Sequence, residues 1–155
     1  MPAPEVVAAL ATRFQATPFA LGVEVPATEL LTALRALRDA HGYRYYVLAT
    51  GSERETVFEV VHAVRNLDSN DTIFVKVAVP KDAPEVDSIV FVYAGAEWQE
   101  REIYDLFGVT FRAHPDLRRI LMPDEYPGHP LRKSFAMDTP WGYRPPTVPV
   151  PEDTP

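Results

Sequence analysis

The prolines of this chain divide it into two unlike parts. Nine of its 16 prolines lie between Pro123 and Pro155, in about a fifth of the 155 residues. Proline has no backbone N–H and fixes φ, so such a stretch favours an extended chain over a packed core. We therefore expect residues 122–155 to form an extended Pro-rich tail, either disordered or laid across the surface of a partner.

The residues before this tail follow helical and strand patterns in turn. Apolar residues recur at helical spacing over about 4–16, and again between Thr28, which can cap a second helix, and Gly42, which suits its end. Two helices on one face of a four-stranded, largely antiparallel or mixed sheet bury these faces, which predicts an α+β two-layer sandwich over residues 1–95. The strands are predicted at 19–25, 43–50, 55–65 and 72–79.

A charged helix is predicted over 96–107, ended by Gly108. On a helical wheel Glu102 falls in an apolar stripe between Trp98 and Leu106. An unpaired buried carboxylate costs several kcal/mol. Glu102 therefore either lies at the edge of the stripe or meets an arginine from elsewhere in the chain or from a partner.

Basic groups gather just after this helix, and we take residues 96–121 as one signature segment. The whole chain has a net charge of -7, yet residues 112–133 contain five Lys or Arg and three Asp or Glu. Arginine is suited to bidentate pairing with carboxylates. An internal network with the acidic helix fits both facts. Residues 86–93, between the last predicted strand and the helix, fit a strand or a short helix equally.

Several function classes are excluded or disfavoured by composition. The absence of cysteine excludes a disulfide framework, a thiolate zinc site, a Cys-held iron–sulfur cluster and a cysteine nucleophile. The acidic net charge argues against a nucleic-acid binder, and no run of about 18 apolar residues is present. No basic residue precedes Arg13, so we expect neither a secretory signal nor a transit peptide.

Two rival functions stay open at this point. The first is a stand-alone metalloenzyme that uses His114, His129 and Asp116, although no H-x-x-H spacing supports it and His62 is interpreted as a core or edge histidine. The second is a binding module whose basic block over 112–133 captures a phosphorylated ligand. No nucleophile elbow, Walker A loop or dinucleotide-binding glycine motif is present.

The charged helix and its continuation resemble a known family. The stretch Glu100-Arg101-Glu102-Ile103-Tyr104-Asp105-Leu106-Phe107-Gly108, then His114-Pro115-Asp116-Leu117-Arg118-Arg119-Ile120-Leu121, resembles the signature of the 30 kDa subunit of the proton-pumping NADH:quinone oxidoreductase. This enzyme is respiratory complex I, and the bacterial form of the subunit is its C subunit. Pro127-Gly128-His129-Pro130-Leu131-Arg132-Lys133 looks like the second block of that family, and Trp98 fits as well.

The resemblance implies a structural and assembly subunit with no active site and no cofactor of its own. It implies a small α+β domain whose extended C-terminal segment wraps over the 49 kDa quinone-site subunit, near the iron–sulfur subunits of the hydrophilic arm. NADH, FMN, iron–sulfur clusters and quinone would be used by other subunits. The expected location is peripheral, on the cytoplasmic face of the bacterial inner membrane.

Under this interpretation, charged and histidine side chains would hold the interface and the extended segment together. Arg118, Arg119, Arg132 and Lys133 would pair with carboxylates in cis or in trans, and His114 and His129 would be hydrogen-bonded hinge residues. The alternative within the same superfamily is the equivalent subunit of a membrane-bound hydrogenase or of a ferredoxin- or deazaflavin-dependent complex. The full predicted network comprises Glu100, Arg101, Glu102, Asp105, His114, Asp116, Arg118, Arg119, His129, Arg132 and Lys133.

Overall fold

The alternating apolar residues after position 56 form the central hairpin of the sheet. In the computed structural model, which describes residues 2–135, β4 (Val57–Asn66) and β5 (Asp71–Pro80) pair antiparallel along their whole length. Ile73, Val75 and Val77 point to one face of β5 and have no exposed surface. This period of two is the pattern of a sheet with one face against the core.

Three more strands complete a mixed sheet in the order β1-β2-β5-β4-β3. The edge strand β3 (Tyr45–Glu53) pairs antiparallel with β4, with a register shift between Tyr46 and Leu48. On the other side, β2 (Gly22–Glu24) pairs parallel with β5. The predicted α+β fold is confirmed, and the sheet has one strand more than expected.

The extra strand arises because the chain turns within residues 19–25, where the apolar alternation predicts one continuous strand. The chain reverses after β1 (Thr17–Phe19), so β1 pairs antiparallel with β2 and the single predicted strand becomes two. Gly22 makes the parallel pairing possible, because a Cβ there would overlap the carbonyl group of Phe74. Val23 is fully buried while Leu21 is about half exposed, so the alternation marks burial only after the turn.

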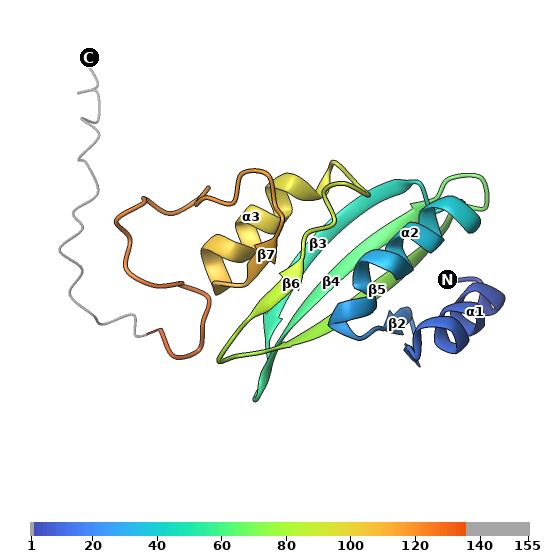
Figure 1. Cartoon of the computed structure of the whole chain (residues 1–155), viewed down its shortest axis with the longest axis horizontal. Coiled ribbons are helices and arrows are strands. Elements are labelled where there is room, and N and C mark those ends of the chain that lie inside the picture. Colours follow the sequence, from blue (N-terminus) through green and yellow to red (C-terminus); the bar gives the residue numbers. More distant parts are fainter. Residues whose placement is uncertain (1, 136–155) are drawn as a thin grey trace, which may run out of the picture.

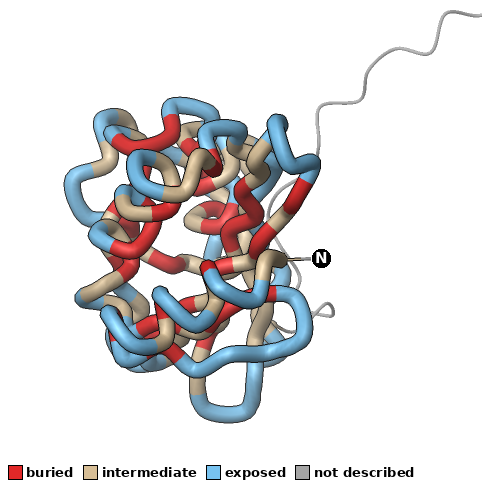
Figure 2. Tube along the Cα trace, turned by 90° about the vertical axis from the view of Figure 1, so that its right-hand side faces the viewer, coloured by how far each residue is buried: buried red, intermediate tan, exposed pale blue. Residues whose placement is uncertain are grey.

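The N-terminal helices supply much of the other layer. α1 (Pro4–Phe14) and α2 (Leu30–Ala40) lie where the sequence predicts them, and their buried apolar residues share one core cluster with the sheet. Thr28 does not cap α2. It lies in the short 3-10 helix η1 (Ala27–Glu29), and no side chain caps the first turn of α2. Figure 2 shows buried segments through the interior and exposed turns around it.

The predicted charged helix is confirmed with the same bounds. α3 (Ala96–Phe107) contacts β3. In the sequence it connects β6 (Glu85–Asp87) to β7 (Thr110–Arg112), and these two strands pair parallel as a second, two-stranded sheet. Of the two interpretations of 86–93, the structure shows a strand that ends at Asp87, followed by a turn. After β7 the chain folds back along α3 (Figure 1).

The predicted Pro-rich tail over 122–155 is described as far as residue 135, and that part carries no helix or strand. Its remaining residues, Trp141 and Tyr143 among them, lie outside the described part of the chain. The division at residues 95 and 121 stays a prediction. Within residues 2–135 no helix has the length and apolar character needed to span a membrane.

Candidate functional site

The acidic side chain of Asp105 organises the segment that follows β7. Asp105 is fully buried on α3, and its Oδ2 accepts the backbone N–H groups of Ile120, Leu121 and Met122 at 3.1, 2.7 and 2.8 Å. Its Oδ1 accepts Arg119 Nη1 at 2.8 Å. Burial alone would raise the pKa of Asp105, but these donors outweigh it and hold the pKa below its usual range.

Arg101, one helical turn before Asp105, holds the same segment from its other side. Its guanidinium donates to the carbonyl oxygens of Arg118 and Arg119 at 3.2 and 3.1 Å. It also lies 3.9 Å from the carboxylate of Asp116 and 4.9 Å from the ring centroid of Trp98. Arg101 and Asp105 lie one turn apart on the same side of α3, and both contact residues 116–122 instead of each other.

The second block of the signature caps the C-terminal end of α3. His129 Nδ1 donates to the carbonyl oxygen of Asp105 at 2.8 Å, and Leu131 N–H donates to that of Leu106 at 3.1 Å. Arg132 Nε donates to the carbonyl oxygen of Phe107 at 2.6 Å. The last carbonyl groups of a helix have no partner within it, so residues 129–132 fill the positions that solvent or a cap would take.

Gly108 is required at the point where these groups meet. It adopts a φ of +73° and its N–H donates to the carbonyl oxygen of Tyr104 at 2.8 Å, which ends α3. A Cβ at this position would overlap the side chains of Arg132 and His129. The His-Pro and basic residues of the second block therefore pack directly on the glycine of the first.

A second buried carboxyl group, Glu100, joins α3 to the turn after β6. Glu100 Oε2 accepts Ser88 Oγ at 2.6 Å, and Oε1 accepts the N–H of Ile89 at 2.8 Å. Burial raises the pKa of Glu100 to about 7, against the opposing effect of these two hydrogen bonds. His114 Nε2 lies 4.0 Å from Glu100 Oε2, and both side chains are without exposed surface.

The two histidines have defined hydrogen-bonding roles. His114 Nδ1 accepts the N–H of Asp116 at 3.0 Å, so the proton is on Nε2, which donates to the carbonyl oxygen of Glu97 at 3.1 Å. His129 donates from Nδ1, because a carbonyl oxygen only accepts. Burial lowers the pKa of His129, because the charged form of the ring is less well solvated there.

The basic side chains of the predicted network differ in what they contact. Arg119 pairs with Asp105, and Arg118 pairs with its near neighbour Asp116 at 2.9 Å. Arg132 donates to carbonyl oxygens, not to a carboxylate, because it lies at a helix end that presents them. The backbone N–H of Lys133, not its side chain, donates to Glu53 at 2.5 Å.

Of the two interpretations of Glu102, the structure agrees with a position at the edge of the apolar stripe. Glu102 is exposed and Trp98 is 60% exposed, while Glu100, Arg101 and Asp105 are buried. The buried polar side chains have hydrogen-bond partners outside α3, which a helical wheel does not include. An arginine partner for Glu102 from elsewhere in the chain is not found among residues 2–135.

The described residues offer little for catalysis or for a metal. No three His, Asp or Glu side chains among residues 2–135 gather closely enough to hold a metal ion. His62 lies on β4, fully buried, with Nδ1 3.1 Å from Tyr46 Oη, and burial lowers its pKa to about 4. The sequence indicated a satisfied histidine at position 62, but its Nε2 has no partner among the described groups.

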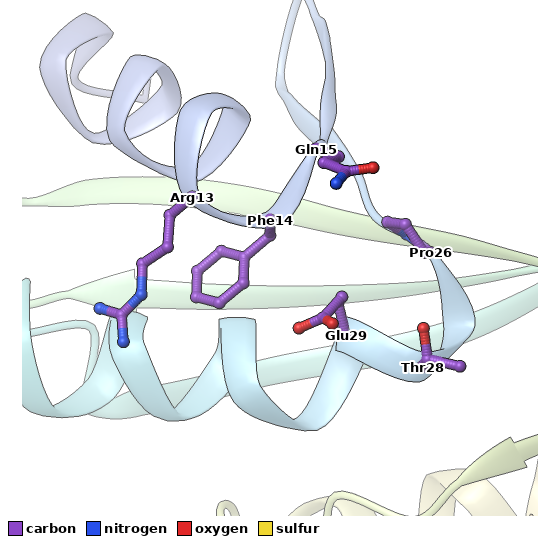
Figure 3. A pocket seen from close by; sticks show the side chains of 6 residues that line it. All are labelled: Arg13, Phe14, Gln15, Pro26, Thr28 and Glu29. Carbon is purple, nitrogen blue, oxygen red and sulfur yellow. The ribbon is translucent and has the colours of Figure 1, made fainter.

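A hollow of about 230 Å³ lies at the other end of the molecule, where α1 ends and η1 begins (Figure 3). Arg13 and Glu29 line it with opposite charges, and the remaining lining residues carry none. The lining contains no histidine and no pair of carboxyl groups, so it offers no arrangement for acid–base chemistry.

Comparison with known sequences places the signature in a family. A family profile described as "Respiratory-chain NADH dehydrogenase, 30 Kd subunit" matches residues 23–140. The NADH-quinone oxidoreductase C subunit of Phenylobacterium zucineum is 43% identical over 120 residues, which cover 76% of this chain and 57% of the relative. The C subunit of Moorella thermoacetica is 38% identical over 120 residues, covering 76% of this chain and 81% of that protein.

Solved structures agree with the fold. A trypsin-resistant fragment of Nqo5 superposes with a TM-score of 0.62 at 28% identity, covering 73% of this chain and 98% of the fragment. A chain of an archaeal respiratory membrane complex, the membrane-bound sulfane sulfur reductase, gives 0.75 at 25% identity, covering 86% and 85%.

The match has a limited span, since the chain covers 57%, 52% and 54% of three of the curated relatives and 81% of another. The matched residues nevertheless include both signature blocks, α3, and four of the five strands of the larger sheet in full or in part. The chain belongs to the family of the 30 kDa subunit of respiratory-chain NADH dehydrogenase, which is the C subunit of NADH-quinone oxidoreductase.

Proposed function

We propose that this chain is a non-catalytic structural and assembly subunit of the hydrophilic arm of a proton-translocating NADH:quinone oxidoreductase. The observation that carries the proposal is the use of the signature residues. Asp105 accepts hydrogen bonds from Arg119 and from three backbone N–H groups, and residues 129–132 cap the end of α3. The most polar part of the chain therefore holds the backbone of residues 118–132 in place against α3.

The proposed role of this arrangement is to present the chain beyond residue 133 to a partner. The hydrogen bonds of Arg132 to α3 and of the Lys133 N–H to Glu53 fix where the segment leaves the domain. We propose that the segment 122–155 docks on the 49 kDa quinone-site subunit, beside the iron–sulfur subunits. The chain would then be peripheral, on the cytoplasmic face of the bacterial inner membrane.

The redox groups belong, in this proposal, to other subunits. The chain contains no cysteine to ligate an iron–sulfur cluster. NADH, FMN, iron–sulfur clusters and quinone would be bound elsewhere in the complex. The contribution of this chain to electron transfer would be to hold the parts of the arm at working distance.

A related complex is the second candidate, because the same fold is found in another respiratory complex. A chain of the membrane-bound sulfane sulfur reductase superposes on this protein with a TM-score of 0.75 at 25% identity. The equivalent subunit of a membrane-bound hydrogenase or of a ferredoxin- or deazaflavin-dependent complex would use the same contacts between α3 and residues 114–133. The input module that copurifies with the chain separates these possibilities.

The test is a tagged pull-down from mildly solubilised membranes, with the wild type and two arginine variants. Arg119→Ala removes a partner of Asp105, whereas Arg118→Ala removes a side chain that is 70% exposed. We expect Arg119→Ala to lower the amount of assembled complex while the turnover per assembled complex stays near wild type, and Arg118→Ala to change neither. Normal assembly with abolished turnover would contradict the structural role, and a chain recovered alone with stoichiometric metal would favour the enzyme alternative.

A further inference from the structure

The outward row of α3 does not have the composition of a solvent-facing helix surface. Trp98 is 60% exposed, Leu106 is half-buried, and exposed Glu102 lies between them on the same row. Leu131 of the second block, 51% exposed, comes close to this row. We call these four residues the α3 outer surface. Apolar side chains gathered in this way are typical of an interaction site.

A hollow continues this surface toward the open edge of the sheet. It has a volume of about 100 Å³ and lies between α3 and the edge strand β3. Ile103, Leu106 and Phe107 form its helical wall, and Leu131 lines it as well. The hollow has room for an aliphatic side chain against its apolar helical wall, while Glu102 and Thr50 add polar groups to its lining.

Glu102 is the one charged residue in the lining of this hollow, and its charge has no partner within the described chain. Two other acids of α3 behave differently. Glu100 and Asp105 are buried and accept hydrogen bonds from several donors. The nearby cation, Arg101, contacts residues 116–119 and the ring of Trp98, and it does not pair with Glu102. The α3 outer surface therefore presents an acid within an apolar frame, which is complementary to a cation flanked by aliphatic groups.

We infer that the α3 outer surface docks a segment of a partner subunit in which an arginine or lysine is flanked by aliphatic residues. The cation would pair with Glu102, one aliphatic side chain would fill the hollow, and Trp98 would lie against the aliphatic stem of the cation. Trp and Arg are the residue types that dominate interface energies, and a charge pair inside an apolar rim is shielded from water. This inference rests on the proposed role as a subunit, and it adds a contact that is separate from the extended tail.

Site-specific crosslinking in the intact complex tests the location. A photo-reactive phenylalanine analogue is placed at Trp98 or at Leu131, and at Leu67 as the control. Leu67 is 66% exposed but lies in the β4–β5 turn. We expect the first two positions to trap one peptide of another subunit, with a Lys or Arg among aliphatic residues, and Leu67 to trap none of it. Crosslinks to a second copy of this chain, or to a peptide without a cation, would overturn the inference.

A charge series tests the pairing itself. Glu102→Lys is compared with Glu55→Lys, which makes the same charge change at an exposed residue between β3 and β4. We expect Glu102→Lys to lower the recovery of the crosslinked subunit about tenfold, with Glu102→Gln in between and Glu55→Lys near wild type. Reversing the partner cation to Glu should restore recovery with Glu102→Lys.

The outcomes separate this inference from the proposed function. If the wild type recovers the subunits of the arm and Glu102→Lys recovers them equally well, the inference is overturned while the structural role stands. If the wild type recovers no other subunit, the structural role fails, and the docking surface fails with it. A thermal melt of each purified variant confirms that the exposed substitution leaves the fold intact.

Discussion

The sheet and the α3 segment are both ordered parts of one small protein, but different forces hold them. The sheet is held by aliphatic side chains such as Val75, Val77 and Leu34, none of which has exposed surface. The segment over 114–133 is held by hydrogen bonds to buried polar groups of α3 and to its last carbonyl oxygens. The stability lost from an apolar core grows with the number of buried atoms that a substitution removes. Removal of one shared acceptor, in contrast, breaks the hydrogen bonds of all its donors together.

This difference predicts how each region responds to change. Loss of a methyl group in the sheet leaves the neighbouring contacts in place, and the cost follows the size of the cavity. Loss of the Asp105 carboxylate removes the hydrogen-bond acceptor of Arg119 and of three backbone N–H groups at once. An interface that must be assembled in one geometry benefits from the second kind of bonding, because hydrogen bonds fix direction as well as distance.

The largest effect is expected from Asp105→Ala. Four donors lose their common acceptor, and breaking a buried pair of this kind costs about 4 kcal/mol. Urea unfolding of the purified chain measures the loss, with Asp124→Ala, at an exposed residue of the same segment, as the control. Hydrogen exchange should show faster exchange at Ile120–Met122 and unchanged protection in β4 and β5. Equal loss of protection in the sheet would mean that the two regions are not separable.

A core truncation gives the contrasting behaviour. Leu34 on α2 is fully buried within the core cluster, and Leu34→Ala should lower the free energy of unfolding by about 3 kcal/mol. The control is Leu21→Ala, which removes the same atoms from a side chain that is 49% exposed and should cost well under half as much. Recovery of the complex per folded chain should be unchanged by either variant. Loss of partner binding at full folding would contradict this assignment of Leu34 to the core alone.

The pH dependence of stability tests the second buried carboxyl group. Because the pKa of Glu100 is raised to about 7 in the folded chain, the folded state binds a proton that the unfolded state releases near its ordinary value of 4.5. The stability contributed by this group is greatest below that value and falls as the pH rises through 7. Glu100→Gln has no such proton, so its stability relative to wild type should rise by about 3 kcal/mol between pH 4 and pH 9.

The comparison with Glu125→Gln isolates that effect. Glu125 is exposed in the extended segment, so its substitution should leave the pH profile of unfolding unchanged. Taking differences between variants cancels the titration of all other groups. A Glu100→Gln profile parallel to wild type would show that Glu100 keeps its ordinary pKa and that the Ser88 and Ile89 donors cancel the effect of its burial.

The elements of the chain were easier to predict than the orientation of one of them. The bounds of α3 follow from local signals, since Gly108 ends the helix with a left-handed conformation that few other residues adopt. The central hairpin follows from alternating apolar residues on either side of a turn-rich loop. The β1–β2 turn was missed because an apolar alternation continues through Leu21 although the chain reverses there.

The face that α3 turns toward the core could not be predicted from its own residues. A helical wheel takes apolar residues as buried, which left the position of Glu102 open and gave no reason to bury Glu100. The donors that permit the burial of Glu100, at Ser88 and Ile89, lie 12 and 11 residues away in sequence. Arg119 contacts a carboxylate, whereas Arg132 contacts carbonyl oxygens, and the residue type alone does not distinguish these two outcomes.

The smallest effect is expected at the helix end, and it separates geometry from charge. Arg132 donates from Nε to the carbonyl oxygen of Phe107 and from Nη2 to that of Gly108. A lysine keeps the charge but cannot present two fixed donors, so Arg132→Lys should lower the free energy of unfolding by about 1 kcal/mol. Lys133→Arg is the matched control, because the hydrogen bond of Lys133 to Glu53 uses its backbone N–H, which the substitution leaves in place. If Arg132→Lys kept the stability of wild type, the cap would depend on positive charge near the helix end, and the directional bonding that distinguishes the α3 segment from the sheet would not extend to residue 132.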